Sequence, residues 1–384
     1  MNKQRFVAVF LGVALTFGLL AVAPSLALAA NEVVIGVSAP LTGSISTLGQ
    51  STKNAALLAQ DEVNAKGGLS VGGKKIKARF VIEDDQNEPE ATASVFQRLI
   101  YQENVLGIIG SQASKCSLAG APIAESAGVA QLSPWSTNPT LTKGRKWVFR
   151  AAFTDDFQGV VVAKFAYMDL KARKAAVLYD VASDYNKGIA EVFRDSFSKL
   201  GKVVAFETYT TGDRDFSAQL TRIKQADPDV LFLPNYFNEV PLQAAQAHKL
   251  GLKATIIGSD SWDSPKLVEL GGDDVNGTYF SNHYSPDIDR PQTKEFVKKY
   301  KARFGDVPDA AAALTYDAAY MMFAAVEKAG KLDRKAIRDA LAATKGFQGV
   351  TGVITFSGGG DPVKSAVMIK VDDGKFSYMK TVNP

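Results

Sequence analysis

The strongest constraint on the fold of this chain is a regular alternation of apolar, strand-like segments with amphipathic, helix-like segments, which begins after residue 31. Parallel neighbouring strands need a long connection, and a helix is the usual one. The alternation therefore predicts an α/β fold in which helices cover doubly wound parallel sheets. The strand-like segments of the first half are 33–40, 75–85, 105–111 and 129–134, and the helix-like ones are 50–68, 89–104 and 117–128.

The same order recurs later in the chain. Residues 78–112 and 204–237 share one layout: a strand, an acidic loop, an amphipathic helix, a second strand and a small polar turn. A chain of about 350 residues is too long for one compact core, so we expect two similarly wound lobes. Three further helices are predicted within 291–344, and a terminal hairpin within 350–380. The very apolar helix near residue 320 is expected in the protein core rather than in a membrane, because acidic residues interrupt it.

Residues 1–29 have the pattern of a secretory signal peptide. Lys3 and Arg5 precede a long apolar stretch, and an Ala-Leu-Ala sequence ends at Ala29. Small residues at these alternate positions are what signal peptidase requires, so we expect cleavage near Ala29 and export to the periplasm. An uncleaved membrane anchor is the alternative, because the apolar stretch approaches the length that spans a bilayer.

Composition excludes several classes of protein. The chain has 44 Lys and Arg against 40 Asp and Glu, and this mild balance does not resemble a nucleic-acid-binding surface. Cys116 is the only cysteine, which rules out an internal disulfide, and with two histidines it cannot form an all-Cys/His zinc site. We expect no nucleic-acid partner, no metal and no cofactor.

Catalytic motifs are missing or out of context. Residues 68–74 resemble a phosphate loop, but Lys75 stands where Ser or Thr is required. A nucleophile at Ser114 or Cys116 would need a base, usually His. His283, which follows a strand-like segment, is the candidate that is hardest to assign to a solvated surface. These observations favour a protein that is not an enzyme.

Residues 110–117, Gly-Ser-Gln-Ala-Ser-Lys-Cys-Ser, lead from a buried strand through small polar residues into a helix. A helix N-terminus carries unpaired N–H groups, and open parallel sheets bind ligands at the carboxyl ends of their strands. The stretch therefore suits a carboxylate, with the Ser114 hydroxyl as an added donor. A simple helix cap at Ser114 explains the local sequence equally well.

Several motifs, in order and spacing, resemble the periplasmic leucine/isoleucine/valine-binding proteins. They are "VVIGVSAPLTGSISTLGQ", "GVAQLSPWSTNPTLT", "GDRDFSAQLTRIKQADPDVLFLPNY" and "GLKATIIGSD". The resemblance implies a type I periplasmic binding protein, with two lobes joined by three crossover segments and a ligand in the cleft between them. It places lobe 1 at 31–151 plus 283–354, and lobe 2 at 152–282 plus 355–384.

The resemblance also implies roles for individual residues. Ser114 and Thr137 match positions that bind the ligand's carboxylate. Trp135 stands where the family uses a backbone carbonyl for the ligand's ammonium group. Asp260 stands where an acidic residue, more commonly Glu, pairs with that ammonium group. An amino acid carries both charges, and burying them requires donors for one and a carboxylate for the other.

Other positions are expected to shape the pocket. By resemblance, Tyr185 and Tyr236 close over the ligand, while Leu48 and Ala311 replace larger aromatic residues around its side chain. We expect the Trp135 indole to face the rim, which leaves room for a branched or aromatic hydrophobic side chain. An indole that turns inward would instead favour ligands the size of alanine.

The resemblance implies a substrate-binding receptor of an ABC transporter, which closes on a small amino acid and delivers it to a membrane permease. Two alternatives stay open at this point. A receptor of the same fold could report ligand binding to a signalling partner. A receptor for urea or short amides would keep the transport role without needing to bind a zwitterion.

Overall fold

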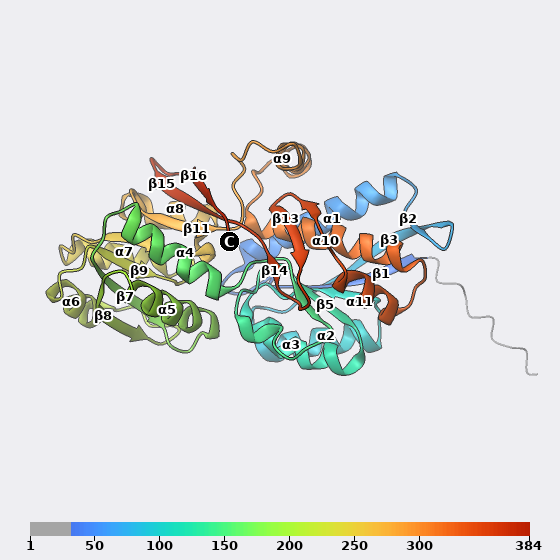
Figure 1. Cartoon of the computed structure of the whole chain (residues 1–384), viewed down its shortest axis with the longest axis horizontal. Helices are drawn as coiled ribbons and strands as arrows, with labels where there is room; N and C mark the ends of the chain where they lie inside the picture. Colours follow the sequence, from blue (N-terminus) through green and yellow to red (C-terminus); the bar gives the residue numbers. More distant parts are fainter. Residues whose placement is uncertain (1–31) are drawn as a thin grey trace, which may run out of the picture. The chain divides into compact units, whose positions relative to one another are not determined.

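The computed structural model describes residues 32–384, and the predicted signal peptide lies outside them. Two large, mainly parallel β-sheets are present in this part of the chain, together with a small three-stranded sheet (Figure 1). The α/β fold predicted from the alternation is therefore confirmed. Within residues 32–384, no helix has both the length and the apolar character needed to cross a membrane.

The first large sheet has the strand order β2-β3-β1-β4-β5-β6. Its strands are parallel except for β2, which pairs antiparallel with β3. Most of β1 is buried on both faces, as expected for a parallel sheet covered by helices on two sides. The strands are β1 (Glu32–Ala39), β2 (Leu69–Val71), β3 (Lys74–Asp84), β4 (Gly107–Ile109), β5 (Ala130–Ser133) and β6 (Val148–Arg150).

Helices cover both faces of the first sheet. Helices α2 and α3 lie on one face, and α1, α10 and α11 lie on the other (Figure 1). Helix α9 packs against α1 and α10 through an aromatic cluster. The helices are α1 (Ser46–Ala65), α2 (Pro89–Tyr101), α3 (Ser114–Ala127), α9 (Pro291–Phe304), α10 (Ala310–Ala329) and α11 (Arg334–Ala342), with a 3-10 turn η1 (Pro139–Leu141).

The second large sheet has the strand order β16-β15-β11-β10-β9-β7-β8. Strands β8, β7, β9, β10 and β11 are parallel, whereas β15 and β16 run antiparallel at one edge. The strands are β7 (Lys174–Asp180), β8 (Lys202–Tyr209), β9 (Val230–Leu233), β10 (Thr255–Gly258), β11 (Tyr279–Asn282), β15 (Ala366–Asp372) and β16 (Lys375–Val382).

Alternate residues of β7 contact the two helical layers of the second sheet. Ala175 and Val177 pack with α4 and α5, whereas Ala176 and Leu178 pack with α6, α7 and α8. This period of two is the one expected for a strand covered on both faces. The helices are α4 (Asp155–Met168), α5 (Asp184–Phe197), α6 (Ser217–Gln225), α7 (Val240–Lys249) and α8 (Pro265–Gly271), with 3-10 turns η2 (Asp260–Trp262) and η3 (Gly272–Val275).

The chain passes between the two large sheets after β6, after β11 and before β15, which confirms the predicted three crossovers. The lobe boundaries at 151/152, 282/283 and 354/355 stay predictions. The predicted terminal hairpin is correct only for β15 and β16. The preceding segment instead belongs to the small sheet, in which β13 pairs with both β12 and β14. The three strands are β12 (Phe347–Gly349), β13 (Gly352–Phe356) and β14 (Pro362–Val363).

Helix α10 agrees with the sequence prediction, whereas helix α4 does not. Helix α10 is mostly buried, as predicted, and its Asp317 carboxylate accepts backbone N–H bonds from Val350 (2.6 Å) and Thr351 (2.9 Å). Helix α4 was missed in the sequence. Helix α4 is covered on several sides and so has no clear polar face. A helix is identified in a sequence by the regular alternation of an apolar face with a polar one, and this alternation is missing here.

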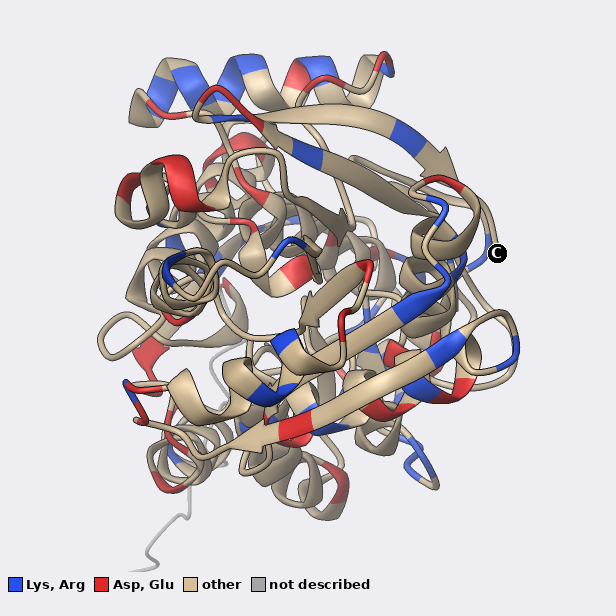
Figure 2. Ribbon diagram, turned by 90° about the vertical axis from the view of Figure 1, so that its left-hand side faces the viewer, with Lys and Arg blue, Asp and Glu red and all other residues tan. Residues whose placement is uncertain are grey.

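Basic and acidic residues are interspersed along the helices, strands and loops (Figure 2). Helix α9, at the top of that view, carries the densest row of basic residues. Two of them pair with acidic residues of α1: Lys299 lies 3.4 Å from Glu62, and Arg303 pairs with Asp61 at 2.5 Å. This mixed surface agrees with the mild charge balance of the sequence.

The first turn of α1 lies very close to the segment that follows β1. A Cβ atom at Gly49, in the first turn of α1, would overlap the carbonyl group of Pro40. The neighbouring Ile45 and Leu48 are buried on the same turn. Only glycine allows this approach without moving backbone atoms.

We expect Gly49→Ala to lower the free energy of unfolding by about 1–3 kcal/mol through overpacking, although alanine is the better helix former. The measurement is urea or thermal unfolding of the purified protein. Gly359→Ala is the control, because a Cβ there meets nothing within 4 Å. Equal stability of the two variants would contradict the close approach.

Candidate functional site

A pocket of about 20 Å³ lies where loops from the two large sheets meet. Its lining residues follow the carboxyl ends of parallel strands, β1, β4 and β5 in the first sheet and β7, β9 and β10 in the second. This is where open parallel sheets bind ligands. The predicted site residues that line it are Leu48, Ser114, Trp135, Thr137, Tyr185, Tyr236 and Asp260.

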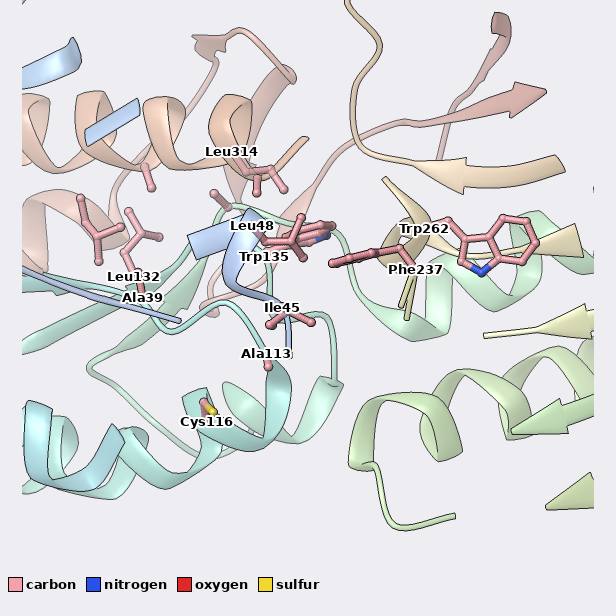
Figure 3. Close-up of a cluster of buried hydrophobic side chains, with 14 of the residues drawn as sticks. Ala39, Ile45, Leu48, Ala113, Cys116, Leu132, Trp135, Phe237, Trp262 and Leu314 are labelled. Atoms are coloured by element: carbon pink, nitrogen blue, oxygen red, sulfur yellow. The ribbon is translucent and has the colours of Figure 1, made fainter. Parts of the chain in front are cut away.

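Ala311 is the predicted site residue that does not line the pocket. It is fully buried in the first turn of α10 and belongs to the hydrophobic core that also contains Leu48 and Leu314. Figure 3 shows Leu314 on the α10 side of Leu48, with Trp135 close to Leu48 and directed toward Phe237. Leu48 therefore lies between α10 and the pocket.

Ser114 is the first residue of α3 and is almost fully buried. Ala113, not Ser114, occupies the N-cap position, and no side chain caps the helix. The alternative of Ser114 as a simple cap is therefore wrong. Its Oγ accepts a bond from the Asn138 backbone N–H at 3.4 Å. Ser114 lines the pocket, and the first N–H groups of α3 have no acceptor within the helix.

Cys116, two residues further along α3, does not have the properties of a nucleophile. The thiol is buried, and burial raises the pKa of Cys116 to about 12. The reactive form of cysteine is the thiolate, which is negligible at neutral pH with such a pKa. The side chain packs as a small apolar residue behind the pocket (Figure 3).

The loop that carries Trp135 and Thr137 is held by a buried guanidinium group. Arg150, at the end of β6, donates to the carbonyl oxygens of Ser136 (2.7 Å) and Asn138 (2.8 Å). Its Nε donates to Asp361 at 2.6 Å, so the same side chain also reaches the segment before β14. The Arg150 side chain is fully buried, whereas that of Asp361 is 42% exposed. The loop geometry therefore depends on one cation.

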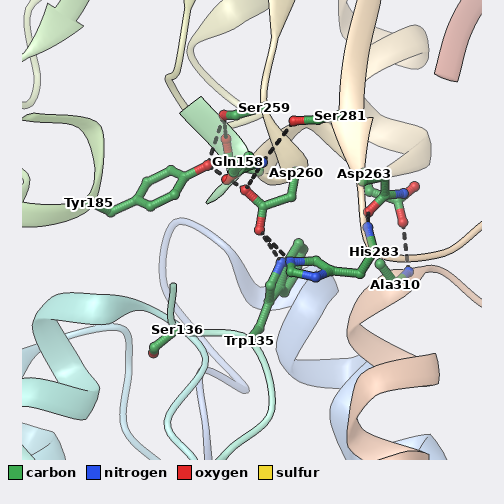
Figure 4. Close-up of polar contacts among 12 residues, drawn as sticks. Trp135, Ser136, Gln158, Tyr185, Ser259, Asp260, Asp263, Ser281, His283 and Ala310 are labelled. Atoms are coloured by element: carbon green, nitrogen blue, oxygen red, sulfur yellow. Dashed lines mark hydrogen bonds and ion pairs between the residues drawn. The ribbon is translucent and has the colours of Figure 1, made fainter. Parts of the chain in front are cut away.

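The carboxylate of Asp260, in the η2 turn after β10, receives hydrogen bonds from four side chains (Figure 4). Tyr185 (2.5 Å) and Gln158 (2.9 Å) donate to Oδ1. Trp135 (2.5 Å) and His283 (2.9 Å) contact Oδ2 through ring nitrogens. Burial raises the pKa of Asp260, but these bonds, that of His283 foremost, outweigh burial and hold the pKa below its usual value. The group is therefore ionised.

His283 and Gln158 are functional candidates that the site prediction omitted. His283 is fully buried and stacks on Phe153, with ring centroids 3.6 Å apart. Burial lowers the pKa of His283 to about 4, so the ring is neutral at pH 7. Since an ionised carboxylate only accepts, the proton lies on the Nε2 atom that faces Asp260. The position of His283 after a strand was the one sequence signal; Gln158 lies in the missed helix α4.

The prediction that the Trp135 indole faces the rim is wrong. The residue is only 6% exposed, and its Nε1 donates to Asp260 across the pocket. A buried indole N–H needs an acceptor, and a carboxylate is a strong one. Tyr185 and Tyr236 line the pocket, with ring centroids 5.6 Å apart, and their closing over a ligand stays a prediction.

Two doubly wound sheets whose strand ends line one common pocket define a two-lobed α/β ligand-binding protein. Residues 32–375 match the periplasmic binding protein family, and the chain belongs to that family. The resemblance seen in the sequence is thereby confirmed.

The three similar proteins described next each align with more than nine tenths of this chain. A Leu/Ile/Val-binding protein homologue of Brucella abortus is 32% identical, with 91% of this chain and 94% of that protein covered. The leucine-binding protein LivK of Thermotoga maritima is 38% identical, with a TM-score of 0.86 and coverage of 92% and 99%. The branched-chain amino acid binding protein LivJ of Streptococcus pneumoniae, solved with isoleucine, is 34% identical, with a TM-score of 0.86 and coverage of 92% and 100%.

We expect Arg150→Met to lower the free energy of unfolding by about 3–5 kcal/mol, because it removes one partner of a buried polar network. Arg145→Met is the matched control: Arg145 also donates to two loop carbonyls, of Thr140 and Leu141, but lies nearer the surface. Its loss should be about 1 kcal/mol or less. Denaturant unfolding measures both, and similar losses would refute the special role of Arg150.

Proposed function

We propose that this chain is the extracytoplasmic substrate-binding receptor of an ABC transporter, and that it closes on a small amino acid with a hydrophobic side chain. One observation carries the proposal. One small pocket has hydrogen-bond donors at one end and a buried, ionised carboxylate at the other, and the two ends belong to different sheets. Family membership and the relatives named for leucine, isoleucine and valine support it.

The donor end would bind the ligand's carboxylate. The first turn of α3 offers N–H groups and the positive end of the helix dipole, and Ser114 adds its hydroxyl. Thr137 lies on the loop that Arg150 holds, almost fully buried at the pocket. Charge-assisted hydrogen bonds to a carboxylate are stronger than neutral ones, so this end would fix the orientation of the ligand.

The acidic end would bind the ligand's ammonium group. Asp260 is the charged residue that lines the pocket, and the remaining walls include the apolar side chains of Ile45 and Leu48. An ammonium group removed from water needs such a counter-charge. Urea and short amides carry no cation, so Asp260 favours the amino acid over that alternative.

Ligand contacts from both sheets would stabilise the closed state, as in hinge-closing receptors. We infer that the closed receptor delivers its ligand to a membrane permease, and that the chain is exported to the periplasm after cleavage near Ala29, within the residues that the structure does not describe. A signalling receptor would use the same pocket with another partner. Nothing in the pocket calls for catalysis, and we propose that the protein is not an enzyme.

The function is tested by thermal-shift and calorimetric screening of the purified mature protein. We expect hydrophobic L-amino acids to stabilise it, by about 2.7 kcal/mol at a concentration one hundred times Kd. Leucinol lacks the carboxylate and 4-methylpentanoate lacks the ammonium group, so both should bind more weakly than leucine. Stabilisation by urea or acetamide, and by no amino acid, would instead support the amide receptor.

Ser114→Ala should weaken leucine binding by about 1–3 kcal/mol, because one charge-assisted bond is lost while the backbone donors of α3 remain. The melting temperature should change little, since Ser114 does not cap the helix. Ser94→Ala, on the exposed face of α2, is the control and should leave affinity unaltered. An unchanged Kd for leucine in the Ser114 variant would remove Ser114 from the site.

A further inference from the structure

All the hydrogen-bonding capacity of the Asp260 carboxylate is used by the protein itself. A carboxylate has about four lone-pair sites. Oδ1 is contacted by Tyr185 and Gln158, and Oδ2 by Trp135 and His283, at distances of 2.5–2.9 Å. An ammonium group therefore cannot pair with Asp260 unless one of these donors withdraws.

The four donors are not equivalent in their origin. Tyr185 belongs to α5 and Gln158 to α4, both of which pack on the second sheet, as Asp260 does. His283 directly follows β11 of the same sheet. Trp135 follows β5 of the first sheet, and its indole N–H is the one donor that reaches Asp260 across the pocket (Figure 4). Trp135 is therefore the donor whose withdrawal leaves the second sheet undisturbed.

The small volume of the pocket also indicates that Trp135 must move for a ligand to bind. The pocket measures about 20 Å³, which holds roughly one water molecule and no amino acid. The buried indole of Trp135 fills the space beside Leu48 (Figure 3). A neighbouring cavity of about 710 Å³ shares Ile45, Tyr185 and Tyr236 with the pocket, so open space adjoins the pocket at these three residues.

We propose that Trp135 is a specificity-determining residue that holds the pocket shut by occupying, on Asp260 Oδ2, the place of the ligand's ammonium group. Binding of an amino acid turns the indole away. This inference rests on the proposed function. An ammonium group bonds a carboxylate more strongly than a neutral indole N–H does, so a cation can displace the ring. A ligand without a cation would displace the ring and leave Asp260 one donor short, which is costly in a buried site.

Trp135→Phe tests the proposal, because it keeps an aromatic ring and removes the N–H donor. The variant should bind L-leucine about tenfold more tightly than the wild type, since the competing bond is absent. L-alanine serves as a second probe with a small side chain and should gain to a similar extent. Trp147→Phe is the control: Trp147 stacks on Arg338, does not line the pocket, and its loss should leave Kd unchanged.

A measurement on the wild type does not depend on folding of that variant. The chain has three tryptophans, so the ¹⁵N spectrum holds three indole N–H signals, which Trp147→Phe helps to assign. Saturating leucine should shift the Trp135 signal strongly. The Trp262 signal should stay in place, because that indole donates to Leu233 O in the core at 3.0 Å.

The outcomes separate this inference from the proposed function. If wild type binds leucine or alanine but Trp135→Phe binds no more tightly, or the Trp135 signal does not move, the indole is a fixed wall and the inference is overturned. If neither protein binds any amino acid, the proposed function fails and the inference falls with it. Tighter binding together with a shifted Trp135 signal supports both.

Discussion

The structure depends on one buried carboxylate. Removing Asp260 from water is tolerable only because hydrogen-bond donors replace the water. Those donors come from helices packed on the second sheet, from the segment that leaves β11 and, through Trp135, from the first sheet. The low pKa of Asp260 and the approach of the two sheets at the pocket are therefore linked. Separation of the sheets would remove at least the Trp135 bond and admit water to the acid.

The passages between the sheets show the same use of buried polar groups. Lys364, just before β15, donates to Ala151 O (3.2 Å) and Thr351 Oγ1 (2.5 Å), so it ties the third passage to the first. Burial lowers the pKa of Lys364 to about 8. His283 stands at the start of the second passage and Arg150 just before the first. The bonds of Lys364 and Arg150 join the first and third crossovers to each other.

The architecture was predictable because it follows from local pattern: buried strands alternate with helices, and parallel sheets require that order. Prediction from the local pattern failed for α4, which is covered on several sides. It also failed for β13, because the strand that β13 pairs with is decided by tertiary contacts. The position of Ser114 at the pocket could be predicted because Ser114 follows the end of a strand and begins a helix. The bonds of Gln158 and His283 to Asp260 could not be predicted, although the position of His283 after a strand drew attention to it, because Asp260 is more than twenty residues away from both.

The predicted orientation of the Trp135 indole was wrong for a physical reason that involves residues 135 and 260 together. By resemblance the acid at position 260 is more often Glu, and Asp is one methylene shorter, which draws the carboxylate back toward β10. The Trp135 side chain is correspondingly long and spans the remaining distance with an N–H donor. Taken singly, a large residue at 135 suggests a side chain turned to the rim, and a shorter acid at 260 suggests a weaker ammonium site. Taken together they are complementary, because the long Trp135 side chain reaches the short Asp260 side chain across the pocket, so the conformation of each depends on the other.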